Sequence, residues 1–307
     1  MRLTLRQLEI FAAIAKAENV SRAAEQLAMS QSAASSALVE LERQFDRALF
    51  DRIGKSLHLN ATGQGLLPLA ESLLAQARDV EAYLSGVTLG PLSIGATLTI
   101  GNYLATLIVA DYMQAHPGAP VDLQVANTDA IVERLLRFDA DLGLIEGVVS
   151  HPDLIVEPWM EDELVVFCGP QHPLATLEVV DNASLAGQAW ILRERGSGTR
   201  SQFDRQIGCQ LGRFDLRLEL EHTEAIKRAV ESGLGVGCLS RLALREAFRR
   251  GSLIELATPQ FDLRRQFFFA RHRLRQQSAA AQCFYQLCRT RTQGAADTLA
   301  LQLPFIP

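Results

Sequence analysis

Residues 5–63 read LRQLEIFAAIAKAENVSRAAEQLAMSQSAASSALVELERQFDRALFDRIGKSLHLNATG, and their apolar spacing predicts three short helices followed by a hairpin. In the first helix, apolar side chains recur every three or four residues, at Leu5, Leu8, Phe11, Ala12 and Ala15. Ser21 is expected to cap a second helix, and a third is expected from about Gln31 to Phe45. Because the break at Met29 and Ser30 is so short, the last two helices predict a helix-turn-helix.

The start of the third helix carries side chains suited to reading DNA bases. These are small amides and hydroxyls that can hydrogen-bond to base edges: Gln31, Ser32, Ser35 and Ser36. Two extended runs between Leu49 and Leu59, joined around Gly54, predict a hairpin "wing" with a basic tip. Arg22, Arg52 and Lys55 are the candidates for phosphate contacts. The alternative is a small helical domain that docks on another protein.

A long helix is expected after the hairpin, with Asn60 as its N-cap. Its apolar residues keep a spacing of 4, 3, 4, 3 and 4, at Leu66, Ala70, Leu73, Ala77, Val80 and Leu84. A strict heptad period favours lengthwise packing on a second helix, so we predict a dimer interface along it. The alternative is an amphipathic helix that lies on its own domain.

Beyond Gly90 and Pro91 the pattern changes to alternating strands and helices, which predicts α/β architecture. Strands are expected at 92–96, 121–126, 142–145, 164–168, 190–192, 216–220, 236–239 and 266–270, with helices at about 100–115, 129–138, 199–211, 223–233, 240–250 and 276–290. The predicted organisation is a DNA-binding domain (1–60), a linker helix (61–89), a regulatory domain (90–291) and a tail (292–307). The regulatory domain is expected to form two lobes, of about 90–160 plus 266–291 and of 161–265.

Polar side chains follow four of the predicted strands, where ligands collect in an open α/β sheet. The candidates for binding a small effector are Thr97, Thr99, Asn127, Ser197, Thr199, Arg200 and Thr223. Hydroxyls beside glycines at the start of a helix suit a carboxylate or an oxyanion. Glu146 is expected either to select a polar or cationic part of the ligand or to pair with Arg193 or Arg195. The alternative for the hydroxyls is that they only cap helices.

Composition narrows the classes of function. The 307 residues carry a net charge of −5, while residues 1–60 hold eight Lys or Arg and seven Asp or Glu, so the N-terminal part is only relatively basic. Five cysteines without a CxxC pair favour a reducing compartment. The six histidines lack metal-ligand spacing, and no GxSxG or HExxH motif occurs, so we expect no metal or cofactor and no catalysis. No stretch is apolar enough to span a membrane, and a cytoplasmic location is expected.

The run LRQLEIFAAIAKAENVSRAAEQLAMSQSAASSALVELERQFDRALFDR, followed by LHLNATGQGLL, resembles the winged helix-turn-helix of LysR-type transcriptional regulators. The long helix and the two α/β lobes extend the resemblance over essentially the whole chain. One departure is Ser36, where many members carry Arg after the serine of the third helix. The resemblance implies a homodimer or homotetramer that binds two-fold related half-sites in double-stranded DNA and senses a small molecule between the lobes. The rival interpretation is a small-anion-binding α/β protein or a transferase-like enzyme, for which residues 1–60 would have no use.

Overall fold

The computed structural model describes residues 3–53, 56–85 and 89–301. Its N-terminal unit consists of α1 (Leu5–Ala17), α2 (Val20–Gln26) and α3 (Gln31–Phe45), followed by the antiparallel hairpin of β1 (Phe50–Ile53) and β2 (Ser56–Leu59). Phe11 and Leu38 lie in the apolar core that the three helices share, and Ala24 and Ala34 let α2 and α3 pack closely. The prediction of a winged helix-turn-helix is therefore confirmed.

The predicted cap of the second helix is wrong by two residues. Asn19, not Ser21, precedes α2, and its Oδ1 atom accepts a hydrogen bond from the amide of Arg22 at 3.1 Å. An Asn side chain caps a helix as well as Ser does, and the earlier start places Val20 against the core.

Helix α4 (Ala61–Leu84) begins at the predicted cap, because Asn60 Oδ1 accepts from the amide of Gly63. It runs through Pro68 without ending there. Ala70 and Leu74 are buried in the core of the N-terminal unit, so one face of α4 belongs to this chain's own fold. None of the helices within the described residues is long and apolar enough to cross a membrane.

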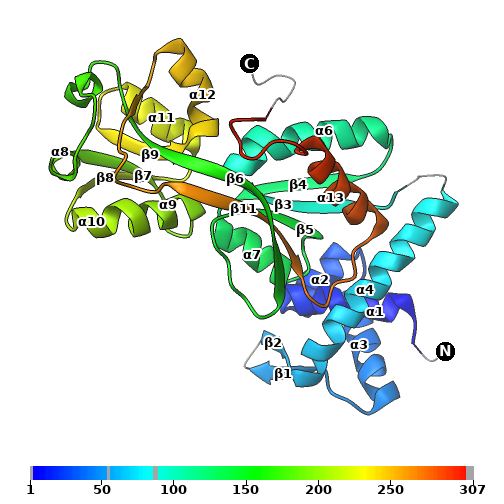
Figure 1. Ribbon diagram of the computed structural model, residues 1–307. Helices are drawn as coiled ribbons and strands as arrows, with labels where there is room; N and C mark the ends of the chain where they lie inside the picture. The colour runs from blue at the N-terminus through cyan, green and yellow to red at the C-terminus, as the bar shows by residue number, and fades with distance from the viewer. Residues whose placement is uncertain (1–2, 54–55, 86–88, 302–307) are drawn as a thin grey trace.

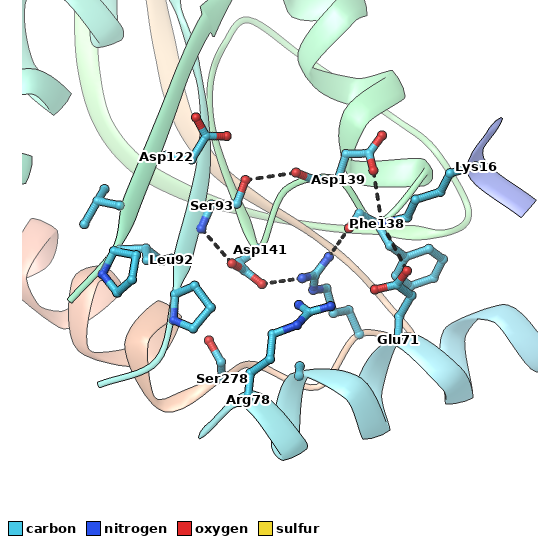
Figure 2. Close-up of a pocket in the computed structure, with 15 residues that line it drawn as sticks. Lys16, Glu71, Arg78, Leu92, Ser93, Asp122, Phe138, Asp139, Asp141 and Ser278 are labelled. Atoms are coloured by element: carbon cyan, nitrogen blue, oxygen red, sulfur yellow. Dashed lines mark hydrogen bonds and ion pairs between the residues drawn. The ribbon is translucent and has the colours of Figure 1, made fainter. Parts of the chain in front are cut away.

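Lys16 joins the N-terminal unit to α4 and to the α/β part of the chain (Figure 2). Its Nζ atom lies 3.0 Å from Glu71 Oε1 on α4 and 3.1 Å from Asp139 Oδ1. Glu71 is only 3% exposed, so this ion pair is largely shielded from solvent. Arg275 and Asp141, 2.5 Å apart, line the same cavity of about 330 Å³ at the junction.

The rest of the chain forms two α/β lobes whose strands join in one sheet of order β4-β3-β5-β11-β6-β9-β7-β8, with β10 paired to β6 (Figure 1). Lobe 1 contains β3 (Leu92–Thr97), α5 (Leu98–Ile100), a π-turn (Gly101–Ala105), α6 (Thr106–Ala115), β4 (Val121–Ala126), α7 (Thr128–Leu136), β5 (Leu142–Glu146) and α13 (Ala279–Arg291). Lobe 2 contains α8 (Asn182–Ala186), β7 (Ala189–Arg193), α9 (Gly198–Phe203), α10 (Cys209–Leu211), β8 (Asp215–Leu220), α11 (Thr223–Glu231), β9 (Val236–Ser240), α12 (Arg241–Arg250) and β10 (Ile254–Leu256).

Two long strands run through both lobes, β6 (Leu154–Cys168) and β11 (Arg264–His272). They pair antiparallel from Leu154–His272 to Glu163–Arg264, and beyond that β6 pairs with β9 in lobe 2. All eight predicted strands are present. The first half of β6, the short β10 and α8 were not predicted. Pro158 and the charged residues around it interrupt the apolar pattern that would predict a strand in this half of β6. The strand accommodates Pro158 beside a register shift in its ladder with β11.

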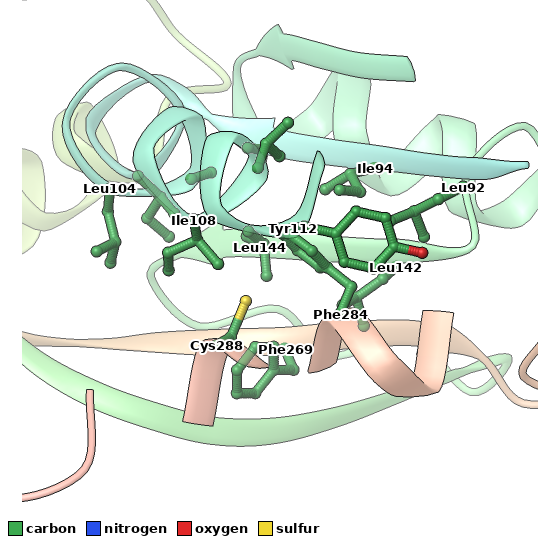
Figure 3. Packing of buried hydrophobic residues seen from close by; sticks show 14 of the residues in the cluster. Leu92, Ile94, Leu104, Ile108, Tyr112, Leu142, Leu144, Phe269, Phe284 and Cys288 are labelled. Atoms are coloured by element: carbon green, nitrogen blue, oxygen red, sulfur yellow. The ribbon is translucent and has the colours of Figure 1, made fainter. Parts of the chain in front are cut away.

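Each lobe has its own apolar core. In lobe 1, helix α13 packs on the same side of the sheet as α6, and Tyr112, Phe269 and Phe284 fill the space between them (Figure 3). In lobe 2, Trp190, Phe203 and Phe214 form an aromatic cluster on one face of the sheet. These rigid cores hold the strand ends, and the loops that follow them, in fixed positions.

Candidate functional site

Four helices of the α/β part begin shortly after a strand, and the residues at their starts include the predicted hydroxyls. Helix α5 follows β3 directly, α7 follows β4 after one residue, α11 follows β8 after two, and α9 follows β7 after four. The predicted residues Thr97, Thr99, Ser197, Thr199 and Thr223 are all buried, each with 3% or less of its surface exposed. Hydrogen bonds from one arginine, Arg265, join Thr99 of lobe 1 to Thr199 of lobe 2, so the two lobes meet here.

The carboxylate of Glu146, at the end of β5, occupies the N-terminus of α5. Its Oε1 atom accepts hydrogen bonds from the amides of Thr99 at 2.6 Å and Ile100 at 3.3 Å. Its Oε2 atom accepts from Nη1 of Arg265 at 2.8 Å and from the hydroxyl of Thr199 at 3.3 Å. An internal carboxylate thus fills a helix terminus that favours negative charge.

Arg265, on β11, is the centre of this buried polar network. Besides Glu146 it binds Asp162 Oδ2 through Nε at 2.7 Å, and it donates to the hydroxyls of Thr199 at 2.9 Å and Thr99 at 3.2 Å. Asp162 also accepts from Ser240 Oγ at 2.8 Å. Burial alone would raise the pKa of Glu146, but the positive charges of Arg265 and Arg193 outweigh it and hold this pKa below its ordinary value. The Glu146 carboxylate is therefore ionised and paired at neutral pH.

The predicted partner of Glu146 is wrong. Arg193 binds the neighbouring Glu194 at 2.8 Å, and the partner of Glu146 is Arg265, which the sequence analysis did not single out. Arg200 is likewise committed elsewhere: it contacts Asp204 at 2.9 Å and Glu219 at 2.8 Å. Its guanidinium consequently has little capacity left for a ligand.

Close backbone contact between α7 and α9 draws the lobes together beside the network. The amide of Gly198 donates to Thr128 Oγ1 at 3.2 Å, and a Cβ atom at Gly198 would lie 2.2 Å from the carbonyl oxygen of Glu146, so only glycine fits. Asn127 caps α7, since its Oδ1 atom accepts from the amide of Ala130 at 3.0 Å. The side chain of Asn127, a predicted effector contact, therefore caps a helix in the structure.

Two of the predicted hydroxyls, those of Ser197 and Thr223, are buried and do not cap a helix. Thr223 Oγ1 is buried without a hydrogen-bond partner among the described residues. Ser197 precedes α9 but makes no capping bond with its side chain. Nearby, the hydroxyl of Tyr103 in lobe 1 donates to Glu224 in lobe 2 at 2.9 Å, which is a second polar contact between the lobes. Burial and the charge of Glu224 raise the pKa of Tyr103, so this phenol stays protonated.

The other predicted surfaces lie on the N-terminal unit and α4. Gln31, Ser32, Ser36 and Arg22 are exposed, and Ser35 is half-buried. Ser30 caps α3, and its hydroxyl lies 3.1 Å from that of Ser32. Arg52 lies in β1, and Lys55 falls outside the described residues.

The predicted heptad residues of α4 divide between two faces. Ala70 has no exposed surface, and Leu66 packs against the core of its own unit. Leu73, Val80 and Leu84 are 45%, 59% and 77% exposed, and Ala77 is half-buried. With Leu69, which is 64% exposed, the three form a continuous apolar stripe on the outer side of α4.

Residues 5–64 match the family described as "Bacterial regulatory helix-turn-helix protein, lysR family", and residues 85–293 match "LysR substrate binding domain". The chain belongs to the LysR family. It is 43% identical over 292 residues to the HTH-type transcriptional regulator YeiE of Escherichia coli, a match that covers 94% of this chain and 98% of YeiE. As a member of this family it is a DNA-binding transcriptional regulator with an effector-binding domain, and not an enzyme.

Solved structures of LysR regulators share the fold. Full-length OxyR of Pseudomonas aeruginosa superposes with a TM-score of 0.69 at 20% identity, over 97% of each chain. The regulatory domain of CcmR from Synechocystis, solved in complex with 2-PG, is 29% identical, with a TM-score of 0.62 over 67% of this chain and 98% of that domain.

Replacing Arg265 with Met tests the central role of this arginine. The change leaves Glu146 and Asp162 buried without a counter-ion, so we expect a loss of roughly 3–5 kcal/mol in the free energy of unfolding. Arg264→Met is the matched control, because Arg264 is exposed and pairs with Asp262 at the surface. Thermal and urea unfolding at pH 7 measure both variants, and equal losses would contradict the assignment.

The pH dependence of the same pair has a definite sign. In the native chain the pKa of Glu146 is lowered, so its stabilising contribution is lost as the pH falls through that pKa. In Arg265→Met, burial without the arginine raises the pKa of Glu146, and protonation then stabilises the folded state. The stability gap between the two proteins should consequently narrow on going from pH 7 to about pH 5.

Proposed function

We propose that this LysR-family regulator senses a small anionic effector between its lobes and thereby changes how a dimer or tetramer presents its α3 helices to promoter DNA. The observation that carries the proposal is the Glu146 carboxylate on the N-terminus of α5, because it marks the cleft as an environment that stabilises an oxyanion. The site of action would be the cytoplasm, where the DNA lies.

Ser197 and Thr223 support the position of the effector. They stand at the first turns of α9 and α11, where a helix dipole favours negative charge, and the structure leaves their hydroxyls without helix-capping bonds. A carboxylate or oxyanion of a few heavy atoms suits this set better than a large apolar molecule. The CcmR domain with 2-PG gives a precedent for a small ligand in a related regulatory domain.

The recognition helix supports the DNA-binding part of the proposal. Its exposed first turn offers Gln31, Ser32 and Ser36 to base edges, with Ser35 behind them, while Arg22, Arg52 and Lys55 would contact phosphates. An effector that prefers one lobe arrangement shifts the population of that arrangement. In a paired assembly, this shift would alter half-site spacing or DNA bend.

Gln31→Ala separates base reading from phosphate binding. On a site selected from random duplexes it should cost roughly 1–3 kcal/mol of binding free energy and relax sequence preference, because an amide that reads a base is lost. Arg22→Ala should weaken all sequences alike and reduce the slope of log K against log salt by about one. Gln44→Ala, near the other end of α3, is the control and should bind as the native protein does. Equal losses of Gln31→Ala on specific and random duplexes would refute base reading.

Leu73→Asp tests the apolar stripe of α4 as a dimer interface. A carboxylate buried without a partner costs several kcal/mol, enough to dissociate many dimers, and DNA affinity should fall because half-sites can no longer be bound together. Gln64→Asp is the control, since Gln64 is exposed on the opposite face of the same helix. Sedimentation equilibrium measures the mass of each. A Leu73→Asp protein that sediments as the native one does would remove the stripe from the interface.

Ser197→Ala and Thr223→Val test the effector site. Loss of a hydroxyl bonded to a charged ligand should weaken its affinity about ten- to a hundred-fold. Thermal shift with a panel of carboxylates, inorganic oxyanions and 2-PG identifies the ligand and its dependence on the two residues. Ser278→Ala is the control, because this serine caps α13 away from the α9 and α11 helix starts. An anion that stabilises all four proteins equally binds somewhere other than the cleft.

A further inference from the structure

Residues 292–301, which follow α13, pack back against the two lobes. Thr292 accepts a hydrogen bond from the indole of Trp159 at 2.9 Å, and the chain then turns back towards β6 (Figure 1). Further along, Leu301 is 3% exposed and joins the core of lobe 1. Its carbonyl oxygen accepts from Arg245 of α12, in lobe 2, at 3.5 Å. Residues 292–301 therefore touch both lobes.

Between these anchors the tail pairs with β6 at the point where that strand passes from lobe 1 to lobe 2. Asp297 forms a parallel bridge with Glu161, and the amide of Thr298 donates to the carbonyl oxygen of Glu161 at 2.9 Å. On this edge β9 begins to pair only at Leu164, so the tail covers backbone that the sheet leaves free.

Thr298 also enters the polar network of the cleft. Its side chain is buried, and its hydroxyl donates to Asp162 Oδ1 at 2.8 Å, beside Ser240. The other oxygen of Asp162 holds Arg265, which in turn holds Glu146 against the amides of α5. An unbroken series of buried hydrogen bonds thus connects the tail to the first turn of α5.

We propose that residues 292–301 are a strap that holds the two lobes in the arrangement seen in the structure, with Thr298 as a positioning residue for Asp162, Arg265 and Glu146. Asp162 is fully buried and needs its donors, so it binds the tail only when Ser240, Arg265 and Thr298 converge on it. A change in lobe angle moves these donors apart, because they come from β9, β11 and the tail. Release of the strap from Asp162 and a change in the angle between the lobes are consequently coupled. The inference rests on the proposed function only in treating this cleft as the effector site.

Hydrogen exchange of the full-length protein without any effector tests the strap. The reporters are the amides of Thr99 and Ile100, which are protected by Glu146 at the far end of the network. Thr298→Val keeps the size of the side chain but removes the hydroxyl, and should speed exchange at both amides roughly tenfold. Thr298→Ser retains a hydroxyl and should restore the native rate, which a purely steric role would not predict. Thr290→Val, at an exposed threonine of α13, is the matched control and should change neither amide.

A second variant guards against a merely local effect at Thr298. Leu301→Ala weakens the apolar anchor of the tail without touching a polar group, and should also speed exchange at Thr99 and Ile100. If either variant frees the amide of Thr298 while Thr99 and Ile100 keep the native rate, the tail docks independently of the cleft and the proposal is wrong. It is equally wrong if Thr298→Val alters none of the three amides. Because no ligand is added, failure of the anion proposal leaves this result unaffected.

Discussion

The contact of Arg265 with Glu146 and Asp162 is the constraint on which the regulatory part of the molecule depends. Removing an ion from water costs several kcal/mol, and a buried pair is tolerated only where geometry and hydrogen bonds satisfy every group. The groups here come from β5, β6, β9, β11, α5 and α9, so their satisfaction requires that both lobes stand in one relation to each other. Two carboxylates share one guanidinium, and the amides of α5 supply the remaining stabilisation of Glu146.

This arrangement changes what an effector must do. Glu146 already occupies the amides of Thr99 and Ile100 at the start of α5, so an incoming anion either binds at the starts of α9 and α11 or displaces Glu146 from these amides. Displacement would leave Arg265 and Asp162 to rearrange, at a cost that only a ligand with strong charge-assisted hydrogen bonds could offset. Binding beside Ser197 and Thr223 keeps the network intact. An anion that binds beside Ser197 and Thr223 therefore needs less total binding energy than one that displaces Glu146, and it shifts the population of lobe arrangements by its difference in affinity for them.

How far the sequence predicts this molecule depends on whether the relevant contacts are local. The longer helices, the two strands of the wing and the hydroxyls at the strand ends follow from spacing and capping within a few residues, and the structure has them close to the predicted positions. Arg265 could not be singled out, because Arg264 and Arg265 stand side by side in a strand and only the sheet order distinguishes them. Successive side chains of a strand point to opposite faces of the sheet, so Arg264 points to solvent and Arg265 does not. The strands on either side of β11, β5 and β6, bring Glu146 and Asp162 to Arg265. The heptad spacing of α4 does not show which of its residues pack within the chain, because a regular repeat gives no sign that Ala70 faces the chain's own core.

Lys16 determines which lobe can act directly on the DNA-binding unit. Its partners in the described residues are Glu71 on α4 and Asp139 in lobe 1, and the hollow beside α1 and the wing is lined on its far side by Leu136, Arg137, Phe138 and other residues of lobe 1. Lobe 1, α4 and α1 thus form one platform. Lobe 2 connects to it through β6, β11 and the tail, and through the contacts of Gly198, Thr199 and Glu224 with lobe 1. If the platform moves as a unit, a change in lobe angle displaces lobe 2 and leaves α3 where it is. Under that condition the effector signal would have little effect on the recognition helix within one chain, and contacts of lobe 2 with another copy of the chain would carry it. This is a physical reason for a regulator of this construction to work as an assembly.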